Sequence, residues 1–122
     1  MSRALLAAGA LVMALAVAAG AASLHAARSA VHPDAARLLQ TAVLYQLIHG
    51  LAIILEGVLA RISPSKLLAA AGILHIAGVV AFSGSLYILA FTGVSLGAVG
   101  PIGGSAFIAG WLALAAYAVR SR

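Results

Sequence analysis

The chain contains four long apolar segments, at residues 4–24, 38–59, 67–91 and 102–119. A helix rises about 1.5 Å per residue, so roughly 17–25 apolar residues are needed to cross a bilayer, and all four segments meet this length. Since 65% of the 122 residues are hydrophobic and 7% are charged, no segment is left to build a water-soluble domain. The sequence therefore predicts one all-α integral membrane domain and excludes a soluble catalytic module.

Prolines mark the expected helix starts. Pro33, Pro64 and Pro101 each suit the first turn of a helix, because proline fixes φ and lacks an N–H that would have no partner there. We expect an up-down bundle of four transmembrane helices, at about residues 4–24, 34–59, 65–91 and 101–119. The connection over 92–100 carries three glycines and no charge, and we expect it to form a compact, partly buried turn.

The seven Lys and Arg residues outnumber the two acidic residues, which in a soluble protein would suggest a nucleic-acid partner. Membrane topology explains the excess better. With a cytoplasmic N-terminus, Arg28 and Arg37 lie outside and five cations lie inside, as the positive-inside rule requires. These five are Arg3, Arg61, Lys66, Arg120 and Arg122. We therefore expect a multi-pass protein of the bacterial inner membrane, with both termini cytoplasmic and no nucleic-acid partner.

The first apolar segment also has the features of a cleavable signal peptide, with a basic residue, an apolar run and small residues at 19–21. However, Ala10, Ala14, Ala18 and Ala22 recur at four-residue spacing, which suits close packing against another helix. We expect the segment to be retained as the first transmembrane helix.

The second segment carries the most informative side chains. Polar and ionisable groups inside hydrocarbon are costly, and each normally faces protein or a water-filled cavity. Steps of three and four residues place Thr41, Tyr45, His49, Ala52 and Glu56 on one stripe, with Gln46 beside His49. Two interpretations stay open. The stripe either makes hydrogen bonds that fix helix packing, which we favour, or forms a path for a proton, an ion or a ligand.

Glu56 is expected near the cytoplasmic end of this helix, paired with Arg61 or Lys66 or hydrated. His75 is expected within about one turn of His49 in depth, because the second and third helices run in opposite directions. Two histidines at one depth can ligate haem or a metal. We nevertheless expect no metal site and no cofactor, because the chain has no cysteine and no carboxylate is expected at that depth.

Two further clusters combine small and polar residues. Ser83 and Ser85 flank a glycine in the third segment, where we expect their hydroxyls to bond helix carbonyls, the alternative being a polar lining for a small cavity. Pro101, Gly103 and Gly104 open the fourth helix. We favour tight packing over anion binding there, because the residues of a phosphate loop are missing.

Five blocks of residues occur in order along the chain. They are Gly20-Ala21 with His25, Gln40-Thr41 with Tyr45-Gln46 and His49, Phe-Ser-Gly-Ser-Leu-Tyr at 82–87, Pro-Ile-Gly-Gly at 101–104, and Phe107 with Gly110-Trp111. The set closely resembles the YgdD-like small membrane proteins, a domain of unknown function (423) found in bacteria and in eukaryotes with mitochondria. The resemblance implies a multi-helix integral membrane protein with no established activity, and it supplies no catalytic residues.

The resemblance also separates the candidate residues. His25, Tyr45, Gln46 and His49 fall in the family pattern, whereas His75 stands where the family has an apolar residue. The resemblance therefore favours a site around the four residues of the family pattern and disfavours a cofactor held between His49 and His75.

The sequence shows no Ser-His-Asp set and no paired carboxylates, so we do not expect an enzyme. We expect a non-enzymatic structural or accessory protein in the lipid bilayer, acting as a homo-oligomer or within a larger membrane complex. A small transporter or ion-conducting unit that uses the polar stripe is the alternative, and a haem- or quinone-binding protein is a second.

Overall fold

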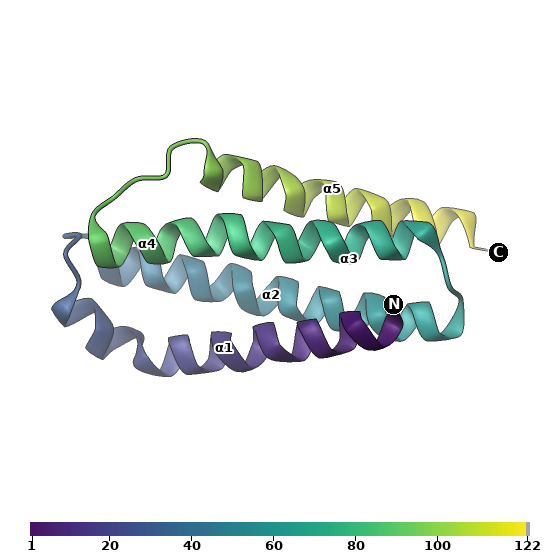
Figure 1. Ribbon diagram of the computed structural model, residues 1–122, viewed down its shortest axis with the longest axis horizontal. Helices are drawn as coiled ribbons and strands as arrows, with labels where there is room; N and C mark the ends of the chain where they lie inside the picture. Colours follow the sequence, from purple (N-terminus) through teal and green to yellow (C-terminus); the bar gives the residue numbers. More distant parts are fainter. Residues whose placement is uncertain (122) are drawn as a thin grey trace.

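The computed structural model describes residues 1–121 and consists of four long helical rods (Figure 1). Each rod is long and apolar enough to cross a membrane, which confirms the prediction of an all-α bundle with four candidate spans. The elements are α1 (Ser2–Ser29), α2 (Ala35–Ile62), a third rod made of α3 (Lys66–Gly78), η1 (Val79–Ser83) and α4 (Gly84–Thr92), and α5 (Val99–Arg120).

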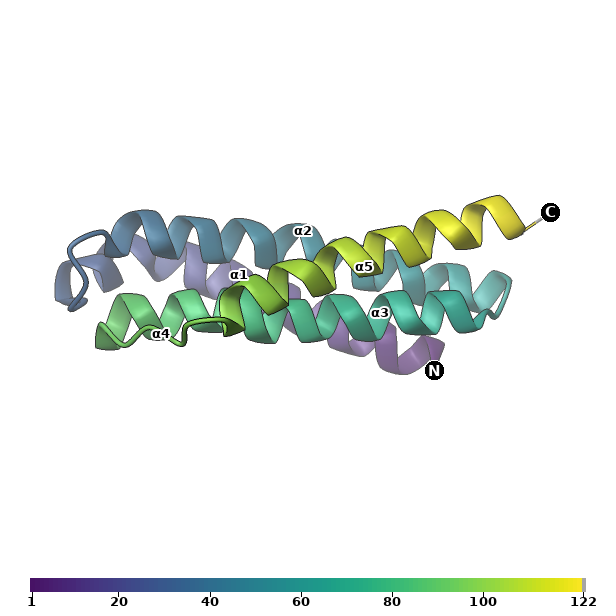
Figure 2. The same ribbon diagram turned by 90° about the horizontal axis from the view of Figure 1, so that it is seen from above.

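The rods run up and down, so both chain ends lie at one end of the bundle (Figures 1 and 2). We call this the termini end, and we call the opposite end, with residues 30–34 and 93–98, the loop end. Helix α2 is central, because it packs against α1 on one side and against α3, η1 and α4 on the other. Helix α5 packs along α3 and η1, so α1 and α5 lie on opposite flanks (Figure 1).

Glycines allow the closest approaches between helices. A Cβ on Gly9 of α1 would lie 2.9 Å from the backbone nitrogen of Ile54, so α1 and α2 touch almost backbone to backbone. A Cβ on Gly103 would overlap the backbone of Phe82, which brings α5 equally close to η1. Helices in lipid associate through such close packing, because the hydrophobic effect does not drive apolar side chains out of hydrocarbon.

The predicted alanine face of α1 does not pack within the bundle. Ala10, Ala14, Ala18 and Ala22 are all exposed, and α1 instead buries Leu5, Gly9 and Ala16. The physical reason is the glycine contact just described, since Gly9 permits a closer approach to α2 than alanine does.

The third rod is not a continuous α-helix. Residues Val79–Ser83 form a π-helical turn, which accommodates one extra residue and shifts the faces of the helix on either side of it. The turn buries Ser83, whose hydroxyl donates a hydrogen bond of 2.8 Å to the Ala42 carbonyl of α2. The sequence pattern gave no indication of this turn.

The connection between α4 and α5 is exposed, contrary to the predicted partly buried turn. Every residue from 93 to 98 is exposed, and the segment arches away from the bundle (Figure 1). Side chains cap its backbone, because Thr92 Oγ1 accepts from the Val94 N–H and Ser95 Oγ accepts from the Gly97 N–H. Gly93 and Gly97 take positive φ angles of 72° and 59°, which favour glycine. The loop therefore needs no burial to satisfy its polar groups.

Candidate functional site

The most deeply buried polar contact joins α2 to α3. Glu56 Oε1 lies 2.7 Å from His75 Nδ1, and both side chains are 0% exposed. Glu56 lies six residues before the end of α2 at Ile62, or about 9 Å along the helix axis. The pair therefore sits within the bundle and not at its surface.

The predicted environment of Glu56 is wrong. The carboxylate does not pair with Arg61 or Lys66 and is not exposed to solvent, because it faces α3. Five residues of helix carry Arg61 about 140° around the axis, onto an exposed face. A carboxylate therefore does lie beside His75, also contrary to the prediction. Antiparallel helices bring the two together from opposite directions along the chain.

The short distance within this pair requires a proton. Two bare lone pairs at 2.7 Å would repel each other, so one of the two groups must carry a proton. The alignment falls short of a good hydrogen bond, and within residues 1–121 neither Glu56 oxygen and neither His75 nitrogen has a well-aligned partner. The two groups are thus close in space, but their hydrogen-bonding capacity is incompletely satisfied.

His49 lies next along α2 toward the loop end. Its Nε2 lies 3.1 Å from the indole nitrogen of Trp111 on α5, and its Nδ1 lies 2.7 Å from the Tyr45 carbonyl oxygen. An indole N–H can only donate, so Nε2 must accept and Nδ1 must carry the proton. Both ring nitrogens are therefore engaged by protein, and the contacts select the neutral Nδ1–H tautomer.

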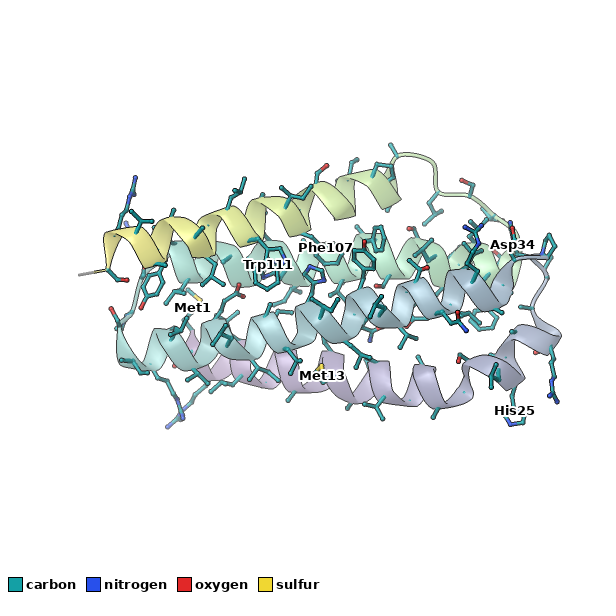
Figure 3. All side chains as sticks on the ribbon, turned by 180° about the vertical axis from the view of Figure 1, so that it is seen from behind. Met1, Met13, His25, Asp34, Phe107 and Trp111 are labelled. Atoms are coloured by element: carbon teal, nitrogen blue, oxygen red, sulfur yellow. The ribbon has the colours of Figure 1, made fainter. Side chains whose placement is uncertain are left out.

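Aromatic rings surround His49. Its ring stacks on Phe107 with centroids 3.5 Å apart, and its centroid lies 5.3 Å from that of His75. Trp111 packs against both imidazoles, with centroids 5.8 Å from His49 and 4.9 Å from His75. Gly110 makes room for this arrangement, since a Cβ there would lie 2.5 Å from the His75 ring. Figure 3 shows Phe107 and Trp111 reaching from α5 toward the other helices.

Gln46 forms a second polar junction, which joins three rods. Its Nε2 donates to the Val12 carbonyl of α1 at 3.0 Å, and its Oε1 accepts from the Tyr87 hydroxyl of α4 at 2.7 Å. Tyr87 is not among the site residues predicted from the sequence. The signal was available in its aromatic hydroxyl inside an apolar segment, but its partner depends on the phase shift at η1.

The other candidate residues lie apart from these junctions. His25 is exposed on α1 near the loop end (Figure 3). Ser85 donates to the Phe82 carbonyl of its own rod, whereas Ser83 reaches across to α2. At the start of α5, Pro101 is exposed and Gly103 packs on η1, as described above.

Two grooves open on the sides of the bundle. The first, which we call the aromatic groove, lies between α2 and α5 and has a volume of about 350 Å³. It is lined by Tyr45, Ile48, His49, Phe82, Gly104, Phe107, Ile108 and Trp111. The second lies between α1, α2 and α4, with Gln46 and Tyr87 among mostly apolar walls, and has a volume of about 400 Å³.

What the arrangement can do chemically follows from its side chains. Within residues 1–121 no group of three or more His, Cys, Asp or Glu side chains is placed to hold a metal ion. The polar groups can join helices, share a proton between Glu56 and His75, and present hydroxyl and ring surfaces to a groove.

Comparison with known proteins identifies relatives but no solved structure. The family model described as "Protein of unknown function (DUF423)" matches residues 19–104. A UPF0382 membrane protein of Staphylococcus haemolyticus is 43% identical over 107 residues, which cover 87% of each chain. The UPF0382 membrane protein YwdK of Bacillus subtilis is 39% identical over 114 residues, covering 92% of this chain and 93% of the relative. No solved structure matches the chain significantly.

The buried pair leads to a prediction about stability. Removing one partner leaves a polar group uncompensated, so Glu56→Met and His75→Phe should each lower the free energy of unfolding by about 3–5 kcal/mol. The double variant should lose less than either single variant, because apolar side chains then face each other. Unfolding in mixed micelles of mild detergent and SDS measures these values.

Leu55→Met serves as the control for this double-mutant cycle. Leu55 is exposed on the same helix, so the change should alter stability by less than about 0.5 kcal/mol. Additive losses from the two single variants would show that Glu56 and His75 do not interact.

Proposed function

Because the chain belongs to the DUF423 family of membrane proteins of unknown function, we propose from its own contacts that it is a non-enzymatic accessory or structural membrane protein. The observation that carries this proposal is the use of the polar stripe. Gln46 contacts α1 and α4, Glu56 contacts α3, and His49 contacts α5. The central helix therefore uses its polar side chains to hold each of its neighbours.

The energies of these contacts favour a role in setting helix register. Interhelical hydrogen bonds in membranes average about 0.6 kcal/mol each, while an unpaired polar group in hydrocarbon costs more. If a helix shifted along its axis, the lost hydrogen-bond energy would be small. The cost of leaving Gln46 or Glu56 without a partner would be larger. A polar stripe of this kind stabilises one arrangement over its alternatives, which suits a scaffold.

The flanking helices leave surface for a partner. In their most apolar windows α1 and α5 have 17% of residues buried, against 44% for α2. The outward face of α1 carries the small residues Ala10, Ala14 and Ala18, over which another helix can approach closely, while Ala22 lines the second groove. These faces support association with a second copy or with a larger membrane complex.

This proposal predicts a partner on the outer face of α1. A photo-crosslinking amino acid at Ala14 should give discrete protein adducts in native membranes. The same amino acid at Leu51, an exposed position of α2 whose neighbours on that face are large apolar residues, should give lipid adducts. Mass spectrometry of the adducts and the oligomeric state in mild detergent provide the readout. A strictly monomeric protein with lipid adducts at both positions would refute the accessory role.

We propose further that the protein lies in the bacterial inner membrane with both termini in the cytoplasm. Arg3, Arg61, Lys66 and Arg120 gather at the termini end, which supports this orientation, while Arg122 lies outside the described residues.

The orientation can be measured because the chain has no cysteine. Ser63→Cys at the termini end should react with a membrane-impermeant maleimide only after cells are opened. Ala98→Cys at the loop end should react in intact spheroplasts. Both positions are exposed, so labelling reports the side of the membrane. The reverse pattern would invert the topology.

One observation favours a second function, proton conduction. Glu56, His75 and His49 form a contiguous series of titratable groups inside the span, with the imidazole centroids 5.3 Å apart. Proteoliposomes with an internal pH dye should then acidify faster than empty liposomes under a pH gradient, and His75→Phe should remove the difference. Leu55→Met is the matched control. Equal rates for protein and empty liposomes would eliminate conduction.

A further inference from the structure

We propose that the aromatic groove binds the ring of a membrane-dissolved quinone, a flat carbonyl-bearing ring on an apolar tail. The volume of about 350 Å³ falls in the range of small-molecule sites, which is roughly 300–1,000 Å³. Quinone binding would be a property additional to the accessory role. Three features support it: the aromatic walls of the groove, its depth in the membrane and the unpaired hydroxyl of Tyr45.

The walls concentrate the aromatic residues of the chain. Of three Phe, three Tyr and one Trp, the groove takes Tyr45, Phe82, Phe107 and Trp111. The Tyr45 ring lies 4.6 Å from Phe82 and 6.0 Å from Phe107, centroid to centroid. Rings at these distances prefer offset or edge-on contacts with further rings, so the open side of the cluster suits a flat ring.

Tyr45 adds a donor at an unusual depth. It lies about 5 Å from the midpoint of α2, using about 1.5 Å per residue, and is 38% exposed. Tyrosine is normally found where the membrane meets water and its hydroxyl can be hydrated. Within residues 1–121 this hydroxyl has no hydrogen-bond partner, and an unpaired hydroxyl in hydrocarbon costs about 1–3 kcal/mol or more.

Depth decides which ligand can supply the missing acceptor. When α2 is centred in a hydrocarbon core about 30 Å thick, lipid ester oxygens lie about 10 Å further from the midplane than the Tyr45 backbone. Acyl chains reach it but carry no acceptor. A quinone dissolves in the hydrocarbon and brings carbonyl oxygens to this depth, where the Tyr45 hydroxyl can donate to one of them.

The groove also has a lateral entrance. Ile48 and Ile108 line it and are 44% and 64% exposed, so a ligand can enter from the bilayer without crossing water. Trp111 cannot replace Tyr45 as the donor, because its indole N–H already binds His49. The ring would therefore lie among the aromatic side chains, with Tyr45 fixing one carbonyl.

Trp111 provides the test, because it is the single tryptophan of the chain and lines the groove. The purified protein is placed in quinone-free nanodiscs and titrated with decylubiquinone, while Trp111 fluorescence is recorded. Wild type should show saturable quenching. Tyr45→Phe should weaken the midpoint about five-fold, which corresponds to one lost hydrogen bond of about 1 kcal/mol.

Glycine variants distinguish quenching of Trp111 by quinone bound in the groove from quenching by random collisions in the bilayer. A side chain on Gly104 would enter the groove with its Cβ 3.8 Å from Phe82, so Gly104→Leu should raise the midpoint at least ten-fold. Gly84 has nothing within 4 Å of an added Cβ and lies outside the groove, so Gly84→Leu should quench like wild type. Ile108→Phe, at an exposed position of the entrance, gives a second blocking variant if Gly104→Leu does not fold.

Three outcomes would overturn the proposal. The first is linear, unsaturable quenching that is equal in wild type and in the blocking variants. The second is stronger quenching of Trp111 by brominated acyl chains in wild type than in Gly104→Leu, without saturation by the quinone, since the groove then holds lipid. The third is a disulfide between copies carrying Ile108→Cys, with quinone unable to compete, since the groove then holds a second copy.

Discussion

A polar side chain inside hydrocarbon cannot hydrogen-bond to water, so its partner must come from the protein. This constraint organises the whole bundle around α2. Its polar residues point in several directions, and three of them contact different neighbours. Gln46 is met by α1 and α4, His49 by α5, and Glu56 by α3. The glycine contacts bring the helices close, while the polar contacts decide how they are aligned along and around their axes.

The general architecture could be predicted from the sequence because it depends on length and hydropathy alone. Four apolar stretches in a chain with few charges leave four helices as the only economical fold, and the structure has four candidate spans. Helix partners could not be predicted in the same way. Ala10 to Ala22 and Gly9 both read as small-residue faces of α1, and only the fit against Ile54 of α2 selects Gly9.

The polar residues of the candidate site could be selected from the sequence, but their partners could not. Glu56 stands out as an acid in an apolar segment, yet its pairing with His75 depends on the rotation of two helices about their axes. Arg61, five residues further along α2, is close in sequence and is therefore the natural expectation. Trp111 and Tyr87 acquire their significance only through His49 and Gln46, which lie 62 and 41 residues away along the chain.

The π-helical turn at Val79–Ser83 gives the third rod two independently phased halves. One extra residue offsets the face of α4 from that of α3 by about 100°, since a helix turns through about 100° per residue. His75 precedes the turn and Tyr87 follows it, and both can therefore face their partners on α2. A continuous α-helix of this sequence would not allow this arrangement. The length of the turn therefore sets how the two polar junctions of α2 are oriented relative to each other. Inserting or deleting one residue within the turn would rotate one of the two contact residues away from α2 and leave the other in place.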